Sequence, residues 1–143
     1  MKINDVLRGK GAEVVTIPPD ATVRDLLALL AEHNVGALVV SSDGSAVTGI
    51  VSERDVVRLM HSDANALAAP VSSIMTVEVY TCEPDDHIDD LMRLMTEKRI
   101  RHVPVVVDDR LSGIVSIGDV VKTRIGELEF EREQLSKYIA SAG

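Results

Sequence analysis

The sequence Gly-Ile-Val-Ser-Glu-Arg-Asp-Val-Val at residues 49–57 occurs a second time, as Gly-Ile-Val-Ser-Ile-Gly-Asp-Val-Val at residues 113–121. Seven of these nine positions are identical. The similarity extends upstream, because residues 14–40 align with residues 79–105 and pair Thr16 with Thr81. A repeat of this length indicates two copies of one small structural unit.

Both copies predict the same order of elements, β-α-β-β-α. In the first copy the strands are predicted at residues 14–17, 37–40 and 49–51, and the first helix begins at the capping-box pattern of Thr22 and Asp25. That helix has apolar residues at i, i+3, i+4 and i+7. These are Val23, Leu26, Leu27 and Leu30, matched in the second copy by Ile88, Leu91, Met92 and Met95. The second helices are expected to begin near Glu53 and Ile117.

A small sheet of this kind exposes an apolar face, so the two copies are expected to pack together about a pseudo-twofold axis, with clefts between them. The predicted fold class is α/β (α+β). The predicted ranges are repeat 1 at residues 1–60, a linker at 61–70, repeat 2 at 71–124 and a C-terminal helical extension at 125–143.

The C-terminal extension predicts one long amphipathic helix. Its apolar residues are Val121, Ile125, Leu128, Leu135 and Ile139, with glutamates largely between them. One interpretation is that the helix packs on the chain's own body or on a dimer mate. The other is that it docks another protein.

Composition excludes several classes of protein. The formal net charge of −8 without a basic cluster argues against nucleic acid as the main partner. Apolar stretches are far shorter than the roughly 20 residues of a membrane helix, so no membrane association is expected. The single Cys82 cannot form an intramolecular disulfide, and the N-terminus lacks the pattern of a secretion signal. We therefore expect a cytoplasmic location.

The repeated motif carries the predicted chemistry. Ser52 ends a strand and Asp55 follows in the first helical turn, and Ser116 and Asp119 repeat this spacing. The free N–H groups at a helix N-terminus and the hydroxyl suit a phosphate. A carboxylate can accept hydrogen bonds from both hydroxyls of a ribose. The same spacing is also typical of an ordinary helix N-cap, but its occurrence twice after the same strand favours a binding role.

The two copies resemble CBS domains, a family named after cystathionine β-synthase, over nearly the whole chain. The resemblance implies a tandem CBS pair that stands alone and binds AMP, ADP, ATP, NAD or S-adenosylmethionine. It implies that Asp55 and Asp119 hold ribose, that Ser52 and Ser116 approach phosphate, and that adenine lies near residues 16–17 and 81–82. Homodimers in which two pairs form a flat disc are also implied.

Arg101 and His102 resemble the basic pair that meets phosphate in nucleotide-sensing CBS proteins such as the regulatory subunit of AMP-activated protein kinase. The first copy has Gly36 and Ala37 at the matched positions, so Arg54 is its candidate cation and the clefts are unequal. The predicted nucleotide-binding residues are Thr16, Ile17, Gly36, Ala37, Ser52, Arg54, Asp55, Thr81, Arg101, His102, Pro104, Ser116, Gly118 and Asp119.

No catalytic constellation or metal-ligand spacing is recognisable among the four histidines and one cysteine, so no enzyme activity, catalytic cofactor or metal is expected. The leading hypothesis is a regulatory module that senses an adenosine nucleotide, AMP or NAD before ATP or ADP, through a ligand-dependent conformational change. The alternative is a dimerisation or docking protein with vestigial clefts, whose C-terminal helix captures an effector protein.

Overall fold

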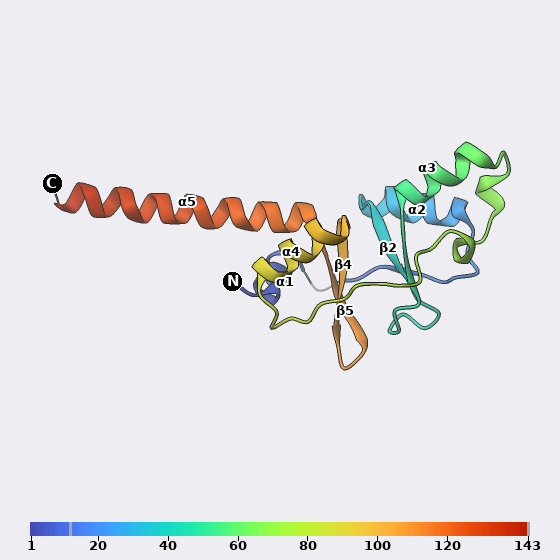
Figure 1. Cartoon of the computed structure of the whole chain (residues 1–143), viewed down its shortest axis with the longest axis horizontal. Helices are drawn as coiled ribbons and strands as arrows, with labels where there is room; N and C mark the ends of the chain where they lie inside the picture. Colours follow the sequence, from blue (N-terminus) through green and yellow to red (C-terminus); the bar gives the residue numbers. More distant parts are fainter. Residues whose placement is uncertain (12, 143) are drawn as a thin grey trace.

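The computed structural model describes residues 1–11 and 13–142 and contains two small sheets, each with its own helices (Figure 1). The elements of the first half are β1 (Thr16–Ile17), α2 (Val23–His33), β2 (Ala37–Val40), β3 (Gly49–Ser52) and α3 (Glu53–Ser62). β1 pairs in parallel with β2, and β2 pairs antiparallel with β3. All four residues of β2 are buried, which makes it the centre of this sheet. The α+β fold class expected from the sequence is confirmed.

The predicted capping box at the start of α2 is confirmed. The Thr22 backbone N–H donates to Asp25 Oδ2 at 3.0 Å, and the Asp25 N–H donates to Thr22 Oγ1 at 3.2 Å. These two bonds satisfy N–H groups that have no partner inside the helix. They hold α2 in the position from which Val23, Leu26 and Leu30 are buried in the first core.

The second half repeats this arrangement with one difference. Its elements are α4 (Ile88–Lys98), β4 (His102–Val107), β5 (Arg110–Ser116) and α5 (Ile117–Ala142). β4 and β5 form an antiparallel pair, and the segment that corresponds to β1 makes only one isolated parallel bridge, from Cys82 to Val105. The cause is Pro104, which stands where the first half has Val39. Because proline has no N–H, it cannot donate to the carbonyl of Tyr80, and the ladder ends there.

Each core also contains a segment that lies outside its own strands and flanking helices in the sequence. Ile3 and Val6 of α1 (Ile3–Lys10) are buried in the second core, and the Ile3 N–H donates to Asp86 O at 2.9 Å. Conversely, Val71 is buried in the first core, after the short 3-10 helix η1 (Ala66–Ala68) and at the start of η2 (Val71–Ser73). Helix α1 therefore ties the N-terminus of the chain to the second half. The domain ranges predicted from sequence stay a prediction.

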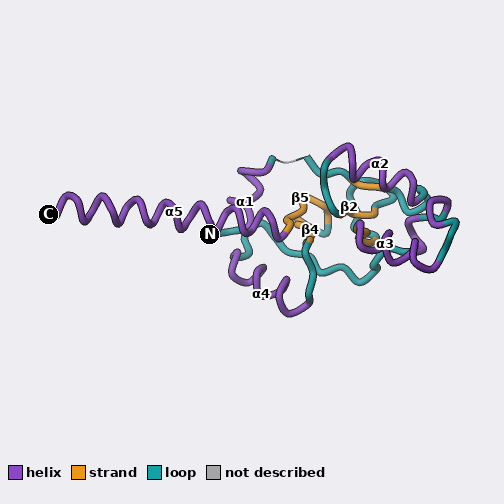
Figure 2. The backbone as a smooth tube through the Cα atoms, turned by 90° about the horizontal axis from the view of Figure 1, so that it is seen from above, coloured by secondary structure: helices purple, strands orange, loops and turns teal. Residues whose placement is uncertain are grey.

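The C-terminal extension is one continuous helix that runs away from the two halves (Figures 1 and 2). Only its first turns contact the body. Val120 is buried there, and Arg124 donates to Asp89 of α4 at 2.8 Å. Within the described parts of the chain, no helix has the length and apolar character needed to cross a membrane.

Candidate functional site

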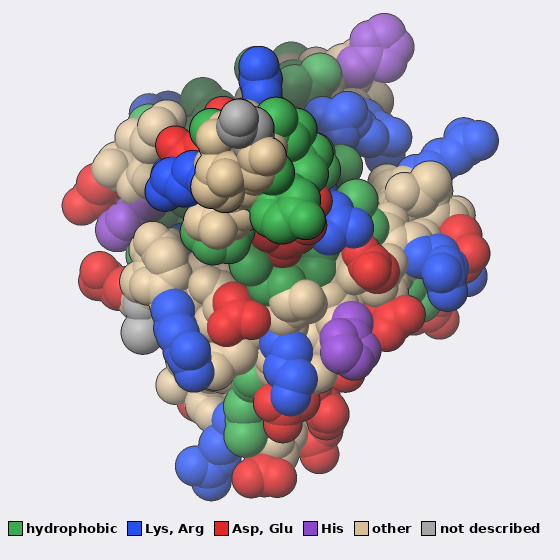
Figure 3. Space-filling model, turned by 90° about the vertical axis from the view of Figure 1, so that its left-hand side faces the viewer, with side chains coloured by type: hydrophobic (Ala, Val, Ile, Leu, Met, Phe, Trp, Pro, Cys, Tyr) green, Lys and Arg blue, Asp and Glu red, His purple; other side chains and the backbone are tan. Residues whose placement is uncertain are grey.

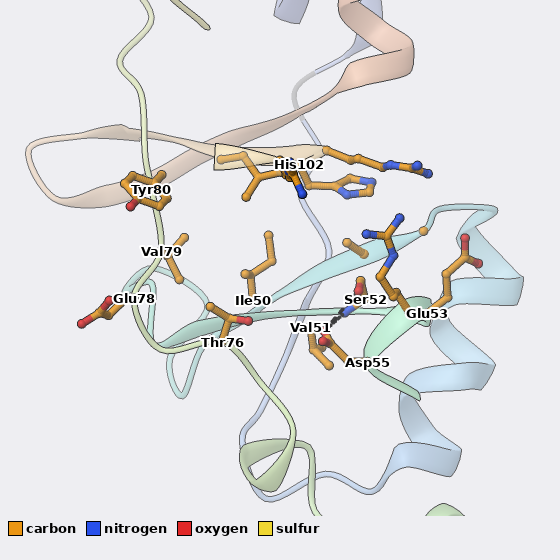
Figure 4. Close-up of a pocket in the computed structure, with 16 residues that line it drawn as sticks. Ile50, Val51, Ser52, Glu53, Asp55, Thr76, Glu78, Val79, Tyr80 and His102 are labelled. Atoms are coloured by element: carbon orange, nitrogen blue, oxygen red, sulfur yellow. Dashed lines mark hydrogen bonds between the residues drawn. The ribbon is translucent and has the colours of Figure 1, made fainter. Parts of the chain in front are cut away.

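A cavity of about 290 Å³ lies between the two halves, with side chains of both halves pointing into it (Figure 4). The first half contributes the start of β2, strand β3 and the first turn of α3. The connection between the halves and the start of β4 form the rest of the wall. The lining residues are Gly36, Ala37, Ile50, Val51, Ser52, Glu53, Arg54, Asp55, Thr76, Glu78, Val79, Tyr80, Arg99, Ile100, Arg101 and His102.

Asp55 is half-buried in this cavity and is held by Ser52. The Ser52 backbone N–H and hydroxyl donate to Asp55 Oδ2 at 2.8 Å and 3.1 Å. Both bonds use the same oxygen, so Asp55 Oδ1 is left to accept from a ligand. The Ser52 hydroxyl must rotate away from Asp55 before it can donate to a phosphate. The motif is therefore a helix cap and a part of the cavity wall at once.

Three arginines from both halves line the cavity: Arg54 on α3, and Arg99 and Arg101 before β4. Arg99 ends α4 in the left-handed conformation, at φ 54°. The matched residue of the first half, Asn34, has the same conformation at φ 52°. Asparagine adopts it readily, whereas for arginine it costs roughly 1–2 kcal/mol. A strained residue that lines a cavity is typical of a functional position.

His102 and Gly36 face each other across the junction of the halves. A Cβ added to Gly36 would lie 3.4 Å from Glu53 Oε1 and 3.6 Å from His102 Cε1, so both side chains lie within van der Waals distance of this position. Burial lowers the pKa of His102, and the nearby Lys10 lowers it further, against the opposing charges of Asp119 and Glu53. His102 is therefore a neutral donor and acceptor at pH 7 rather than a second cation beside Arg101.

Tyr80 supplies a phenol ring to the lining of the cavity. It is 45% exposed, and the Lys98 ammonium lies 5.4 Å from the centre of its ring. An exposed aromatic face beside a cation is suited to stack on a planar base. The sequence reasoning missed both Tyr80 and Arg99. Arg99 had a detectable signal, since the repeat places it opposite a helix-ending asparagine.

The second copy of the motif forms the same cap but has a different partner. The Ser116 N–H donates to Asp119 Oδ2 at 2.9 Å, and the Asp119 N–H donates to Ser116 Oγ at 3.1 Å. The Lys10 ammonium, at the end of α1, lies 2.7 Å from that same Oδ2 and also donates to Ile114 O at 2.8 Å. Burial raises the pKa of Asp119, but the bonds from Lys10 and the Ser116 N–H outweigh it and leave the pKa lowered.

Seven of the fourteen predicted binding residues line this cavity between the halves. They are Gly36, Ala37, Ser52, Arg54, Asp55, Arg101 and His102. The other seven lie elsewhere. Thr16 and Ile17 form β1, where Ile17 is 1% exposed in the first core. Thr81 and Pro104 lie at the edge of the second sheet, and Ser116, Gly118 and Asp119 lie at the start of α5. The binding role of all fourteen residues stays a prediction.

Comparison with known proteins identifies the class. A family model of the CBS domain matches residues 5–62 and again residues 71–126. The chain therefore belongs to the CBS-domain family, and it contains a pair of these domains. Its mixed α+β fold, with two small sheets, matches that of solved CBS pairs.

Three relatives show how close this likeness is. The CBS domain-containing protein CBSX3, mitochondrial, from Arabidopsis thaliana is 38% identical, over 96% of this chain and 71% of that protein. The crystal structure of the CBS-domain containing protein ATU1752 from Agrobacterium tumefaciens has a TM-score of 0.83 at 43% identity, over 87% of this chain and 99% of that one. The CBS domain pair of protein MJ0100, solved in complex with 5-methylthioadenosine and S-adenosyl-L-methionine, has a TM-score of 0.78 at 25% identity, over 89% and 98%.

Proposed function

We propose that this chain is a regulatory CBS pair that binds an adenosine nucleotide in the cavity between its halves. One observation carries the proposal: Asp55 of the first half lines the same cavity as Arg99 and Arg101 of the second. A carboxylate that accepts from a ribose and arginines that donate to a phosphate are the two groups a nucleotide needs. The adenosine ligands of MJ0100 support the same class of ligand.

The size and charge of the cavity favour a mononucleotide. At about 290 Å³, it lies at the small end of ligand sites, which span roughly 300–1,000 Å³. AMP therefore suits it better than NAD, which has a second nucleoside. The arginines favour phosphate over the cationic sulfonium of S-adenosylmethionine. AMP is our first candidate, and NAD, ATP and ADP are the alternatives that the family resemblance supplies.

The proposed mechanism is a shift between orientations of the two halves. Because the cavity takes side chains from both halves, a ligand that fills it contacts both and favours the arrangement in which they converge. The segment from Thr76 to Tyr80 connects the halves and lines the cavity, so it would respond directly. The output is a change in the outer surface that a partner protein reads. Binding and regulation, rather than catalysis, is the activity proposed.

Two further expectations accompany this proposal. A homodimer and an effector protein at the C-terminal helix are implied by the resemblance and by the exposed apolar side chains of α5. A cytoplasmic location stays a prediction, since the relative from Arabidopsis thaliana is named as mitochondrial. A dimerisation or docking protein with vestigial clefts is the competing function, favoured by the same exposed helix.

Isothermal titration of nucleotide-stripped protein with AMP, then NAD, ATP, ADP and S-adenosylmethionine, tests the proposal. We expect saturable micromolar binding of AMP with about one site per chain, since Lys10 occupies Asp119 of the second motif. Heat changes that do not saturate with any of the five compounds would reject nucleotide sensing and favour the docking protein. Conversion of any compound to a product would instead identify an enzyme.

A further inference from the structure

Helix α5 has a narrow apolar stripe that the described part of its own chain leaves uncovered. The large apolar side chains of the stripe are 50–63% exposed. Figure 3 looks at the molecule from the C-terminal end of α5 and shows hydrophobic side chains gathered on one side of the helix. The stripe runs at alternating spacings of four and three residues, through Val121, Ile125, Leu128, Arg132, Leu135, Ile139 and Ala142.

The width of the stripe indicates what covers it. At 3.6 residues per turn, these seven positions span about 100° of the helix circumference. Helices that pack on a globular surface add apolar residues beside the a and d positions, whereas the positions beside this stripe are mostly polar, as in the a/d seam of a coiled coil. One polar residue at an a position, here Arg132, costs stability but specifies register and oligomer state. The occupant that matches this seam is a second α5.

Charges beside the seam select a parallel pairing. In the heptad notation abcdefg, the e and g residues flank the a/d seam. In a parallel pair, each g residue faces the e residue five positions later on the partner. Arg124, at a g position, then lies beside the partner's Glu129, at an e position. Arg132 at its a position then lies next to the partner's Glu131. Arg124 already contacts two carboxylates of its own chain, Asp89 and Glu127, so the partner's carboxylate extends an existing network.

An antiparallel pairing along the whole stripe does not bring opposite charges together. When two antiparallel helices overlap along the whole stripe, the flanking glutamates face neutral side chains. Glu129 then faces Ser136, and Glu131 faces Tyr138. A shifted antiparallel register that brings opposite charges together covers only the first half of the stripe and leaves Leu135 and Ile139 exposed. Only the parallel register both pairs opposite charges and covers the whole apolar stripe.

We propose that two copies of this chain pair through α5 as a parallel, two-stranded coiled coil over residues 121–142. This contact is about 33 Å long at 1.5 Å per residue. The two bodies then lie at the same end of the coiled coil, with the nucleotide cavities outside the contact. The inference gives an interface to the homodimer proposed above and does not depend on nucleotide binding.

Cysteine cross-linking tests the orientation. Ile139→Cys places a thiol at an a position, where parallel partners bring the two Cβ atoms together, and Lys137→Cys places one on the outer face as a matched control. The native Cys82 is 7% exposed and does not interfere. We expect a disulfide-linked dimer from Ile139→Cys within minutes of mild oxidation and little from Lys137→Cys. Equal cross-linking of both variants, or none from Ile139→Cys, overturns the parallel coiled coil.

Sedimentation of charge variants tests the stripe itself. Leu128 and Phe130 are 59% and 62% exposed on α5, but only Leu128 lies in the stripe. We expect Leu128→Asp to raise the dimer dissociation constant at least tenfold and Phe130→Asp to leave it within twofold. Equal effects, or a parent protein that is monomeric throughout, would reject the interface and favour docking of a different protein. AMP titration of the same variants separates this failure from failure of nucleotide binding.

Discussion

Asp55→Asn separates the two roles of the carboxylate in the first motif. Asparagine keeps the shape and one acceptor oxygen for the Ser52 N–H, which Asp55 now accepts at 2.8 Å, so the helix cap is largely retained. What is lost is the charge that a ribose diol would meet. A hydrogen bond to a charged group contributes about 1.5–3 kcal/mol, against about 0.5–1.5 kcal/mol for a neutral one.

The expected loss of affinity follows from that difference. One or two ribose hydroxyls on Asp55 make the loss about 1–3 kcal/mol, which is a fall in AMP affinity of about 5- to 150-fold. Isothermal titration of the stripped protein measures it directly. Urea unfolding of the same samples shows whether the variant remains folded at the temperature of the titration.

Asp25→Asn is the matched control. Asp25 caps α2 with the equivalent backbone bond, in which its carboxylate accepts from the Thr22 N–H at 3.0 Å, but it does not line the cavity. Both variants should lose a similar small amount of stability, and only Asp55→Asn should lose affinity. An AMP affinity within twofold of the parent for Asp55→Asn, or an equal loss for Asp25→Asn, would refute the ribose contact.

Three other changes have defined outcomes. Lys10→Met removes the cation that lowers the pKa of Asp119. A lowered carboxyl pKa stabilises the folded state above about pH 4. In urea unfolding, the variant should therefore be less stable than the parent at pH 7, and the two free energies of unfolding should converge in strong acid. Burial raises the pKa of the Cys82 thiol to about 12, so a thiol reagent at pH 8 should react only after urea is added. Gly49→Ala would place its Cβ 2.8 Å from the sulfur of Met75 and 2.9 Å from the backbone oxygen of Thr76. It should lower the free energy of unfolding in urea by about 1–3 kcal/mol. Gly9→Ala, whose Cβ would have nothing within 4 Å, should not lower it.

Elements that depend on local pattern were predicted well from the sequence. The repeat, the capping box at Thr22 and the starts of α3 and α5 at Glu53 and Ile117 all agree with the structure. Each is a property of residues within one or two helical turns of one another, where hydrogen-bonding groups and apolar spacing act directly. One local departure, the missing third strand of the second sheet, follows from a single proline.

Only some of the predicted binding residues line the cavity. Those that adjoin the first motif or the Arg101–His102 pair line the cavity, whereas the residues predicted to hold adenine, such as Ile17, do not. The segment that does line it opposite the motif, including Tyr80, lies just before the residues expected. The sequence could not reveal this shift, because the position of a connecting segment depends on how the two cores pack.

The sequence by itself determined that this chain has two CBS units, which helices they contain, and that each unit carries a serine and an aspartate one turn apart. The sequence also indicated unequal clefts, but only the tertiary structure decided which groups surround each motif. Lys10 and Asp119 are 109 residues apart and meet at 2.7 Å, while Asp55 faces a cavity with arginines of the other half. Such contacts arise because α1, at the N-terminus, packs into the second core, and no local pattern of residues encodes that long-range contact.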